Sequence, residues 1–260
     1  MLDVQHCAAF TAIAVVAVTA ALTSPSVPQV SVRMTLLPDL RSLPKPRMVF
    51  HDGEISAARL AAGLTPQMRR HFDLFVYVSK AERGPLAQRM HVYRKLPDGV
   101  LNPVFDWAAS TGREKPEVNA RGRHVVTATP AGFYVLDRHR MYPSYHSQNW
   151  DQDMPHAMFF DWTYKGKRTG LAIHAASGKD IAKLGSRASG GCVHLAPENA
   201  AALYGLVQSY RGEVPRPAHQ TDGTSNRGIF LSDDTGALKL ADGYRVLVMI
   251  EDYGGDAALF

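Results

Sequence analysis

Short apolar runs separated by turn residues begin at Asp73, and this pattern predicts a sheet. Residues 74–78 and 90–93 each predict a strand, and the Leu-Pro-Asp-Gly sequence at 96–99 predicts the turn after the second strand. Near the other end of the chain, the apolar run at 244–250 predicts a buried final strand. The pattern therefore favours a mostly β fold with flanking helices.

Two stretches have helical periodicity instead. Residues 55–68 are weakly helical. Pro197 suits the first position of a helix because its missing N–H costs nothing there. An apolar face follows, made by residues that recur at spacings of 0, 3, 4 and 7: Ala200, Leu203, Tyr204 and Val207. We expect this helix to end near Gly212, and we expect the polar, aperiodic residues 137–153 to form a loop.

The remaining segments suggest how the chain is divided. Residues 8–22 form an apolar run, shorter than the roughly twenty residues that span a bilayer, so residues 1–24 are predicted to be a signal peptide. Because residues 1–6 carry no Lys or Arg, a short uncleaved N-terminal anchor is the alternative. A proline-rich linker with a short helix over 25–70, a main domain over 71–253 with a long insertion at 211–243, and a tail at 254–260 complete the predicted organisation.

The cysteine count restricts the chemistry of an exported chain. Of the two cysteines, Cys7 would leave with the signal peptide, so Cys192 would be unpaired. A single cysteine forms no intramolecular disulfide and supplies no thiolate-rich zinc site. In an oxidising compartment such a residue is easier to understand if its reactivity is used.

The net charge is +5, and it becomes +6 when residues 1–24 are removed with Asp3. A basic surface suits an anionic polymer such as the cell wall, or a membrane face. Nucleic acid is the rival partner, but the sequence has no nucleic-acid motif and no dense Lys/Arg block. We therefore expect no nucleic acid, and membrane contact only through an uncleaved N-terminal segment.

Cys192 follows His174 by eighteen residues, and His174 closes the apolar run at 171–173. A nucleophilic cysteine needs a neighbour that accepts its thiol proton, and the Gly- and Ser-rich connection would allow the two side chains to meet. The alternative interpretation is a small buried cysteine and a structural histidine.

The loop before Cys192 has its own predicted roles. Gly190 and Gly191 lack Cβ, so the backbone turns freely there, and the N–H groups of Gly191 and Cys192 are the predicted oxyanion hole. Ser189 is expected to satisfy local backbone groups. If Cys192 directly preceded the helix at Pro197, the helix dipole would favour its thiolate.

The spacing from His174 to Ser-x-Gly-Cys-Val at 189–193 resembles the signature of the L,D-transpeptidases of the YkuD type. The Ser-Thr-Gly sequence at 110–112 and the Thr-Pro-x-Gly-x-Tyr sequence at 129–134 are similar to further segments of that family. The resemblance covers residues 73–207 and the last strand, and implies a YkuD-like mixed sheet sandwich or partly closed barrel with a helix after the nucleophile. It also implies that Cys192 is the nucleophile and His174 the general acid/base, with no metal or organic cofactor.

The chain departs from the family pattern at three positions. Ala175 follows His174 where the family usually has Gly, and Gly190 replaces the second histidine of Ser/Thr-His-Gly-Cys. His194 stands where Arg or Asn is common, and it would either line the site or fill a helix-start position.

Candidate substrate-binding residues lie before and after the catalytic pair. In the family a Met-Pro segment, here Met154-Pro155, lines the substrate cleft, which makes neighbouring Tyr145, Trp150 and His156 candidates for substrate contacts together with His194. The alternative is an aromatic cluster that caps the sheet.

The resemblance implies a cysteine acyltransferase of the periplasm or cell envelope that acts on peptidoglycan stem peptides in cell-wall organisation and cell shape. Carbapenem-type β-lactams would then be covalent inhibitors. Two alternatives remain: a carboxypeptidase or amidase-type hydrolase that uses the same Cys/His site, and a non-catalytic cell-wall-binding module.

Overall fold

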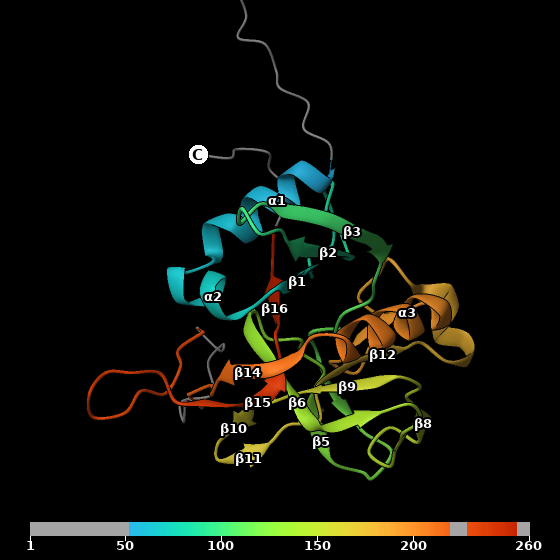
Figure 1. Ribbon diagram of the computed structural model, residues 1–260. Helices are drawn as coiled ribbons and strands as arrows, with labels where there is room; N and C mark the ends of the chain where they lie inside the picture. Colours follow the sequence, from blue (N-terminus) through green and yellow to red (C-terminus); the bar gives the residue numbers. More distant parts are fainter. Residues whose placement is uncertain (1–51, 219–227, 254–260) are drawn as a thin grey trace, which may run out of the picture. The chain divides into compact units, whose positions relative to one another are not determined.

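The computed structural model describes residues 52–218 and 228–253 (Figure 1). The predicted signal peptide or anchor at 1–24, the first part of the predicted linker and the tail at 254–260 lie outside these residues. Within the described ranges, no helix is long and apolar enough to cross a bilayer.

Eight strands form one mixed sheet. The β1–β16 and β12–β13 pairs are parallel, and all other neighbours are antiparallel. The order is β13-β12-β9-β6-β16-β1-β2-β3, with the bounds β1 (Leu74–Ser79), β2 (Arg89–Lys95), β3 (Leu101–Ala108), β6 (Gly132–Tyr142), β9 (Ala157–Phe160), β12 (Ala172–Ala175), β13 (Val193–Leu195) and β16 (Val246–Glu251).

The two edges of this sheet meet. Ser110, just past the end of β3, donates its N–H to the carbonyl of His194 in β13 at 3.0 Å, and the His194 N–H donates back to the Ser110 carbonyl at 2.8 Å. The sheet is therefore nearly closed into a barrel, which satisfies edge groups that would otherwise be unpaired. The predicted class, a mostly β fold with a partly closed barrel, is confirmed.

The central strand β1 is buried along its whole length because both of its faces are covered. Val76 packs into a core shared with β12, β13 and α3 (Pro197–Gln208), whereas Tyr77 packs on the opposite face into a core shared with two N-terminal helices. This double burial explains the continuous apolar run at 74–78.

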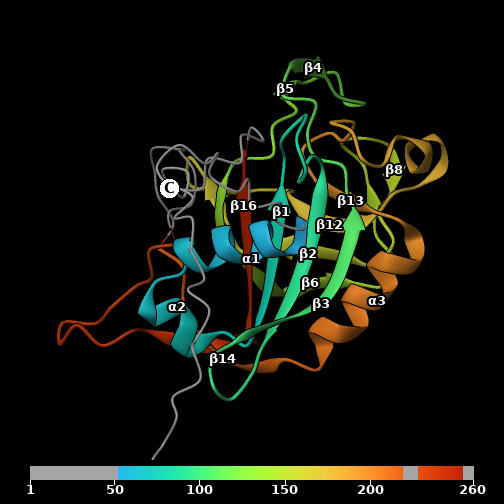
Figure 2. The same ribbon diagram turned by 90° about the horizontal axis from the view of Figure 1, so that it is seen from above.

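The N-terminal helical region differs from the prediction. It forms two helices, α1 (Asp52–Gly63) and α2 (Pro66–His71), because Thr65 caps α2 by accepting the Met68 N–H at 3.2 Å and Pro66 occupies the first turn. Figures 1 and 2 show α1 over β2 and β3, away from α3. Both helices share a core with the sheet, so the compact unit extends across the expected boundary at residue 70/71.

Other predicted boundaries also shift. The helix after Cys192 ends at Gln208 rather than near Gly212. The predicted loop at 137–153 begins with six residues of β6 and contains the short pair β7 (His146–Ser147) and β8 (Gln152–Asp153). The β6–β9 pairing is irregular between Leu136 and Met141, and there Asp137 accepts hydrogen bonds from the His139 N–H and from Arg140. This local bonding explains why β6 lacks a clean period.

Four further short strands lie outside the large sheet. β4 (Pro116–Val118) pairs with β5 (His124–Val126), and β10 (Thr163–Tyr164) pairs with β11 (Lys167–Arg168). A 3₁₀ helix covers Gly178–Lys183 in the connection between β12 and β13.

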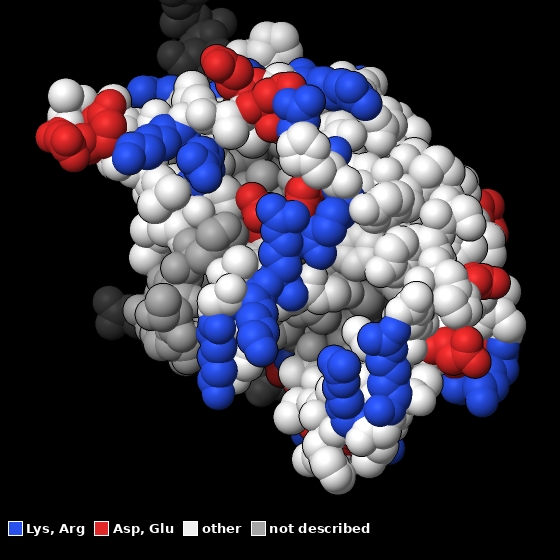
Figure 3. All heavy atoms as spheres, turned by 90° about the horizontal axis from the view of Figure 1, so that it is seen from below, with Lys and Arg blue, Asp and Glu red and all other residues white. Residues whose placement is uncertain are grey.

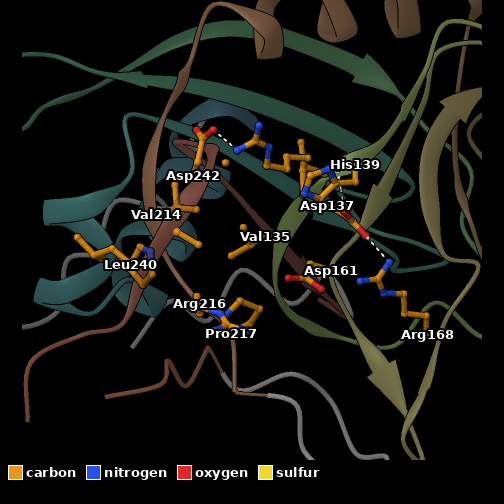
Figure 4. Close-up of a pocket in the computed structure, with 15 residues that line it drawn as sticks. Val135, Asp137, His139, Asp161, Arg168, Val214, Arg216, Pro217, Leu240 and Asp242 are labelled. Atoms are coloured by element: carbon orange, nitrogen blue, oxygen red, sulfur yellow. Dashed lines mark hydrogen bonds and ion pairs between the residues drawn. The ribbon is translucent and has the colours of Figure 1, made fainter. Parts of the chain in front are cut away.

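The long segment at 211–243 begins and ends in an antiparallel ribbon formed by β14 (Arg211–Pro215) and β15 (Leu240–Tyr244). A cavity of about 320 Å³ lies between this ribbon and β6, and Figure 4 shows the side chains that line it. Its charged side chains bond to one another, since Arg138 pairs with Asp242 and Arg168 lies 3.7 Å from Asp137. These ion pairs connect the ribbon and the β11 turn to β6.

The packing of α3 leads to a stability prediction. Leu203 is fully buried between α3 and the sheet, so Leu203→Ala should lower the free energy of unfolding by about 2 to 5 kcal/mol. Ala202→Ser, at an exposed position one residue earlier, should change it by less than about 0.5 kcal/mol. Urea unfolding of both variants measures the difference, and equal effects would contradict this placement of α3.

Candidate active site

Cys192, His174 and His194 lie on the same face of the sheet. In the parallel β12–β13 pair, Ile173 is opposite Val193 and His174 is opposite His194. Side chains alternate along a strand, and Ile173 and Val193 point into the barrel core. His174 and His194 therefore point to the other face, and so does Cys192, two residues before His194.

His174 is buried, with only 1% of its surface exposed. Its Nδ1–H donates to the Ala175 carbonyl at 2.8 Å, so the lone pair of the neutral ring is on Nε2. Burial, with a smaller contribution from His194, lowers the pKa of His174 to about 3. At neutral pH this ring is uncharged, oriented and able to accept a proton.

His194 packs against His174, with ring centroids 4.5 Å apart. Burial lowers its pKa to about 4. Its Nδ1 is buried and has no hydrogen-bond partner among the described residues. Of the two positions considered from the sequence, His194 occupies the one that lines the site, because it lies in β13 and not at the start of α3.

Cys192 is partly exposed, and its sulfur lies 3.5 Å from the Gly170 carbonyl. Burial raises the pKa of its thiol to about 11. The condition for stabilisation by the helix dipole is not met, because β13 separates Cys192 from α3 along the chain, and a helix dipole acts within the first turn. The resting thiol is therefore protonated at neutral pH.

Ser189 holds the loop around the cysteine. Its hydroxyl donates to the Cys192 carbonyl at 2.5 Å and accepts the Gly191 N–H at 3.0 Å. One of the two N–H groups predicted to form the oxyanion hole is thus already engaged, and Cys192 supplies the other predicted donor.

The two segments that resemble the family before the catalytic loop support that loop. Thr129 donates its hydroxyl to the Gly191 carbonyl at 2.6 Å and accepts the Gly112 N–H at 2.8 Å. Gly191 has a φ of +125°, and a Cβ there would lie 2.8 Å from the Ala128 carbonyl oxygen. Glycine is therefore required at 191 by both backbone conformation and space.

Gly190 is required for a different reason. A Cβ at this position would lie 2.7 Å from Cε2 of Trp150. The indole ring occupies the space that any side chain at 190 would need. This contact gives a physical reason for the absence of a histidine at the position where the family pattern has one.

Two cavities meet at Cys192. The aromatic cavity, of about 210 Å³, is lined by Tyr145 and Phe159 and by residues from the β4–β5 hairpin, including Val125. The histidine cavity, of about 80 Å³, is lined by His174, His194, Arg113, Gln152 and Asp180. Trp150, Gly190 and Cys192 line both.

Of the four candidate substrate-binding residues, three line the cavities at Cys192 and one does not. Tyr145, Trp150 and His194 line these cavities. Tyr145 also packs against Phe159 at 5.0 Å, so the alternative of an aromatic cluster describes part of its environment. His156 lines neither cavity and packs against Tyr204 of α3 at 5.5 Å, which does not support a direct substrate contact.

Sequence reasoning missed the charged residues of the histidine cavity, Arg113 and Asp180. Arg113 directly follows the Ser-Thr-Gly segment at 110–112, and this position next to the segment was the one available signal. Asp180 lies in the 3₁₀ helix and carries no sequence signal. In residues 52–218 and 228–253, no group of three or more His, Cys, Asp or Glu side chains is arranged to hold a metal ion.

The raised thiol pKa predicts how the free protein reacts with iodoacetamide. Because the thiolate is the reactive form, the alkylation rate of Cys192 should rise about tenfold per pH unit from pH 7 towards pH 10. Cys192→Ala, in which Cys7 remains, gives the background rate. A plateau below pH 8 would instead indicate a resting thiolate–imidazolium pair.

The L,D-transpeptidase catalytic domain family, YkuD, matches residues 75–236 of the chain. No curated protein matches the chain. Among solved structures, an L,D-transpeptidase from Mycobacterium smegmatis is 13% identical, with 69% of this chain and 59% of that chain covered and a TM-score of 0.38. An L,D-transpeptidase from Xylanimonas cellulosilytica is 19% identical, with coverages of 75% and 68% and a TM-score of 0.38.

A third structure, an L,D-transpeptidase in complex with imipenem, is 16% identical, with coverages of 69% and 59% and a TM-score of 0.38. The chain thus spans about 59% of the length of two of these three proteins. The family match extends over more than half of the chain and includes β12, β13 and the loop between them. The chain therefore belongs to the YkuD family of L,D-transpeptidase catalytic domains.

Proposed function

We propose that this protein is a cysteine-dependent L,D-transpeptidase that acts on peptidoglycan stem peptides through an acyl-enzyme at Cys192. The observation that carries this proposal is the arrangement of Cys192 and His174 on one face of β12 and β13, in one cavity, with Nε2 of His174 free to accept a proton. Nucleophile and base in one cavity are what acyl transfer requires.

In the proposed reaction, Nε2 of His174 takes the thiol proton while the sulfur attacks the carbonyl carbon between an L- and a D-centre. The C–N bond breaks, and His174 gives the proton to the departing amine of D-alanine. An acceptor amine then attacks the thioester and its proton passes through His174 to the sulfur as the C–S bond breaks. The Cys192 N–H is the proposed donor to the oxyanion.

The protonation states favour a general-base mechanism over a resting ion pair. The pKa of the thiol is raised to about 11 and that of His174 is lowered to about 3, so full proton transfer in the empty site is unfavourable. Proton removal must therefore accompany attack on bound substrate. This order protects the free thiol in an oxidising compartment, since thiols are oxidised as thiolates.

The charge distribution supports an anionic polymer as partner. Figure 3 shows Lys and Arg side chains gathered on the face that is turned downward in Figure 1. Together with the net charge of +5, this face suits the carboxylate-bearing cell wall. We propose that the protein works in the periplasm or cell envelope, in cell-wall cross-linking or remodelling.

Hydrolysis is the second candidate function. The histidine cavity is small and polar, and a water molecule bound beside His174 would resolve the same thioester. The product would then be a shortened stem peptide, as made by an L,D-carboxypeptidase.

Product analysis tests the function. With purified stem tetrapeptides and an amine acceptor, mass spectrometry should detect the transfer product for the wild type, whereas Cys192→Ser should lose nearly all transfer because a serine hydroxyl is far less readily ionised. Shortened peptide without transfer product would identify a hydrolase. With imipenem, intact-mass analysis should find one adduct on the wild type and none on Cys192→Ala. If the wild type formed neither product nor adduct, the protein would be a non-catalytic wall-binding module.

The two histidines are predicted to have different effects. His174→Gln should lower the rate constant of thioester formation by about two to four orders of magnitude, the usual range for a positioned general base. His194→Gln should mainly raise the apparent KM, because His194 lines the cavity without the bond that orients His174. Single-turnover acylation distinguishes the two effects. A larger loss of acylation rate in His194→Gln would reverse the assignment.

A further inference from the structure

Trp150 is held firmly against the nucleophile loop. Its ring lies where a side chain at 190 would be, with Cε2 at 2.7 Å and Cζ2 at 2.9 Å from a Cβ built there. The backbone N–H of Trp150 donates to the Ser147 carbonyl at 3.2 Å. The guanidinium carbon of Arg113 lies 5.8 Å from the ring centre, and Arg113 is itself fixed by Glu117 and by the Ala188 carbonyl at 2.6 Å.

Trp150 lines both of the cavities that meet at Cys192. The aromatic cavity is lined by apolar and amide groups, among them Val126, Leu171 and Asn119. The histidine cavity has less than half its volume, about 80 Å³ against about 210 Å³. The two sides of the sulfur therefore differ in size, and of the two cavities only the histidine cavity is lined by the charged side chains of Arg113 and Asp180.

The chemistry of acyl transfer decides which part of the substrate occupies each cavity. His174 must reach the nitrogen that leaves and the nitrogen that enters, because it gives a proton to the first and takes one from the second. Both nitrogens therefore lie on the side of the histidine cavity. The acyl chain that stays on the sulfur then extends into the larger aromatic cavity.

We propose that Trp150 is the specificity-determining residue of this site: it restricts the nucleophile that resolves the thioester to water or to an amine whose carbon carries groups no larger than those of the D-alanine that leaves. This inference rests on the proposed acyl transfer at Cys192. The atoms next to the acceptor amine must fit between Trp150, His174 and His194. Bulk on those atoms beyond that of D-alanine meets the indole ring, whereas bulk farther from the amine does not.

Acceptor competition tests the specificity. The wild type should use glycine in preference to the branched amino acid D-valine, and Trp150→Ala should reduce that preference by about tenfold or more, the range for misfits of this size. Trp150→Phe, which keeps an aromatic wall, should retain most of it. Tyr164→Ala removes an exposed aromatic ring that lines neither cavity and should retain all of it. The ratio of kcat/KM for the two acceptors is the readout, and an unchanged ratio in folded Trp150→Ala would overturn the proposal.

A second measurement does not depend on transpeptidation. Gly190→Ala should lower the Tm in the wild type, where the new Cβ meets the indole ring, and should lower it less in the Trp150→Ala background. Trp150→Ala should also accelerate alkylation of Cys192 by a bulky maleimide more than by iodoacetamide. Equal effects of Gly190→Ala in both backgrounds would overturn the proposed wall. If these results hold but no variant transfers acyl groups, the wall stands and the proposed function fails.

Discussion

The pair of backbone hydrogen bonds between Ser110 and His194 closes the sheet and fixes the candidate site. These bonds join the end of β3 to β13 at 3.0 and 2.8 Å, although more than eighty residues separate the two positions. Because β13 is bonded on one side to Ser110 and on the other to β12, its register is set, and a slip by one residue would turn Cys192 and His194 into the core. The placement of the nucleophile is thus a consequence of barrel closure.

Burial determines the electrostatics of the site. The same enclosed environment raises the pKa of the Cys192 thiol and lowers the pKa values of His174 and His194, because desolvation penalises every charged form. The resting site is therefore neutral, and its reactivity depends on what the substrate brings into it. The hydrogen bond from Nδ1–H of His174 to the Ala175 carbonyl involves no charged group. It selects the neutral tautomer whose Nε2 can accept a proton.

The departure from the family pattern at Gly190 is explained by a neighbouring side chain. Glycine at 190 leaves room for the Trp150 ring, whereas a Cβ at that position would collide with it. Ser189 retains a structural role, since its hydroxyl bonds both the Cys192 carbonyl and the Gly191 N–H. The loop keeps its geometry through Ser189 and Thr129, while Trp150 lines both cavities beside the sulfur.

The sequence by itself determined the elements whose patterns are local. Leu203 and Val207 mark one face of α3 because helical neighbours are three or four residues apart, and the run at 74–78 marks β1 because burial excludes polar side chains. The pairing of Cys192 with His174 came from their spacing and its resemblance to a family. Only the tertiary structure decided the contact between Trp150 and Gly190, the packing of His156 against Tyr204 of α3 and the inclusion of α1 and α2 in the core. Each of these depends on contacts between residues far apart in the chain, and no periodicity within one segment encodes which distant segment will fill the space beside it.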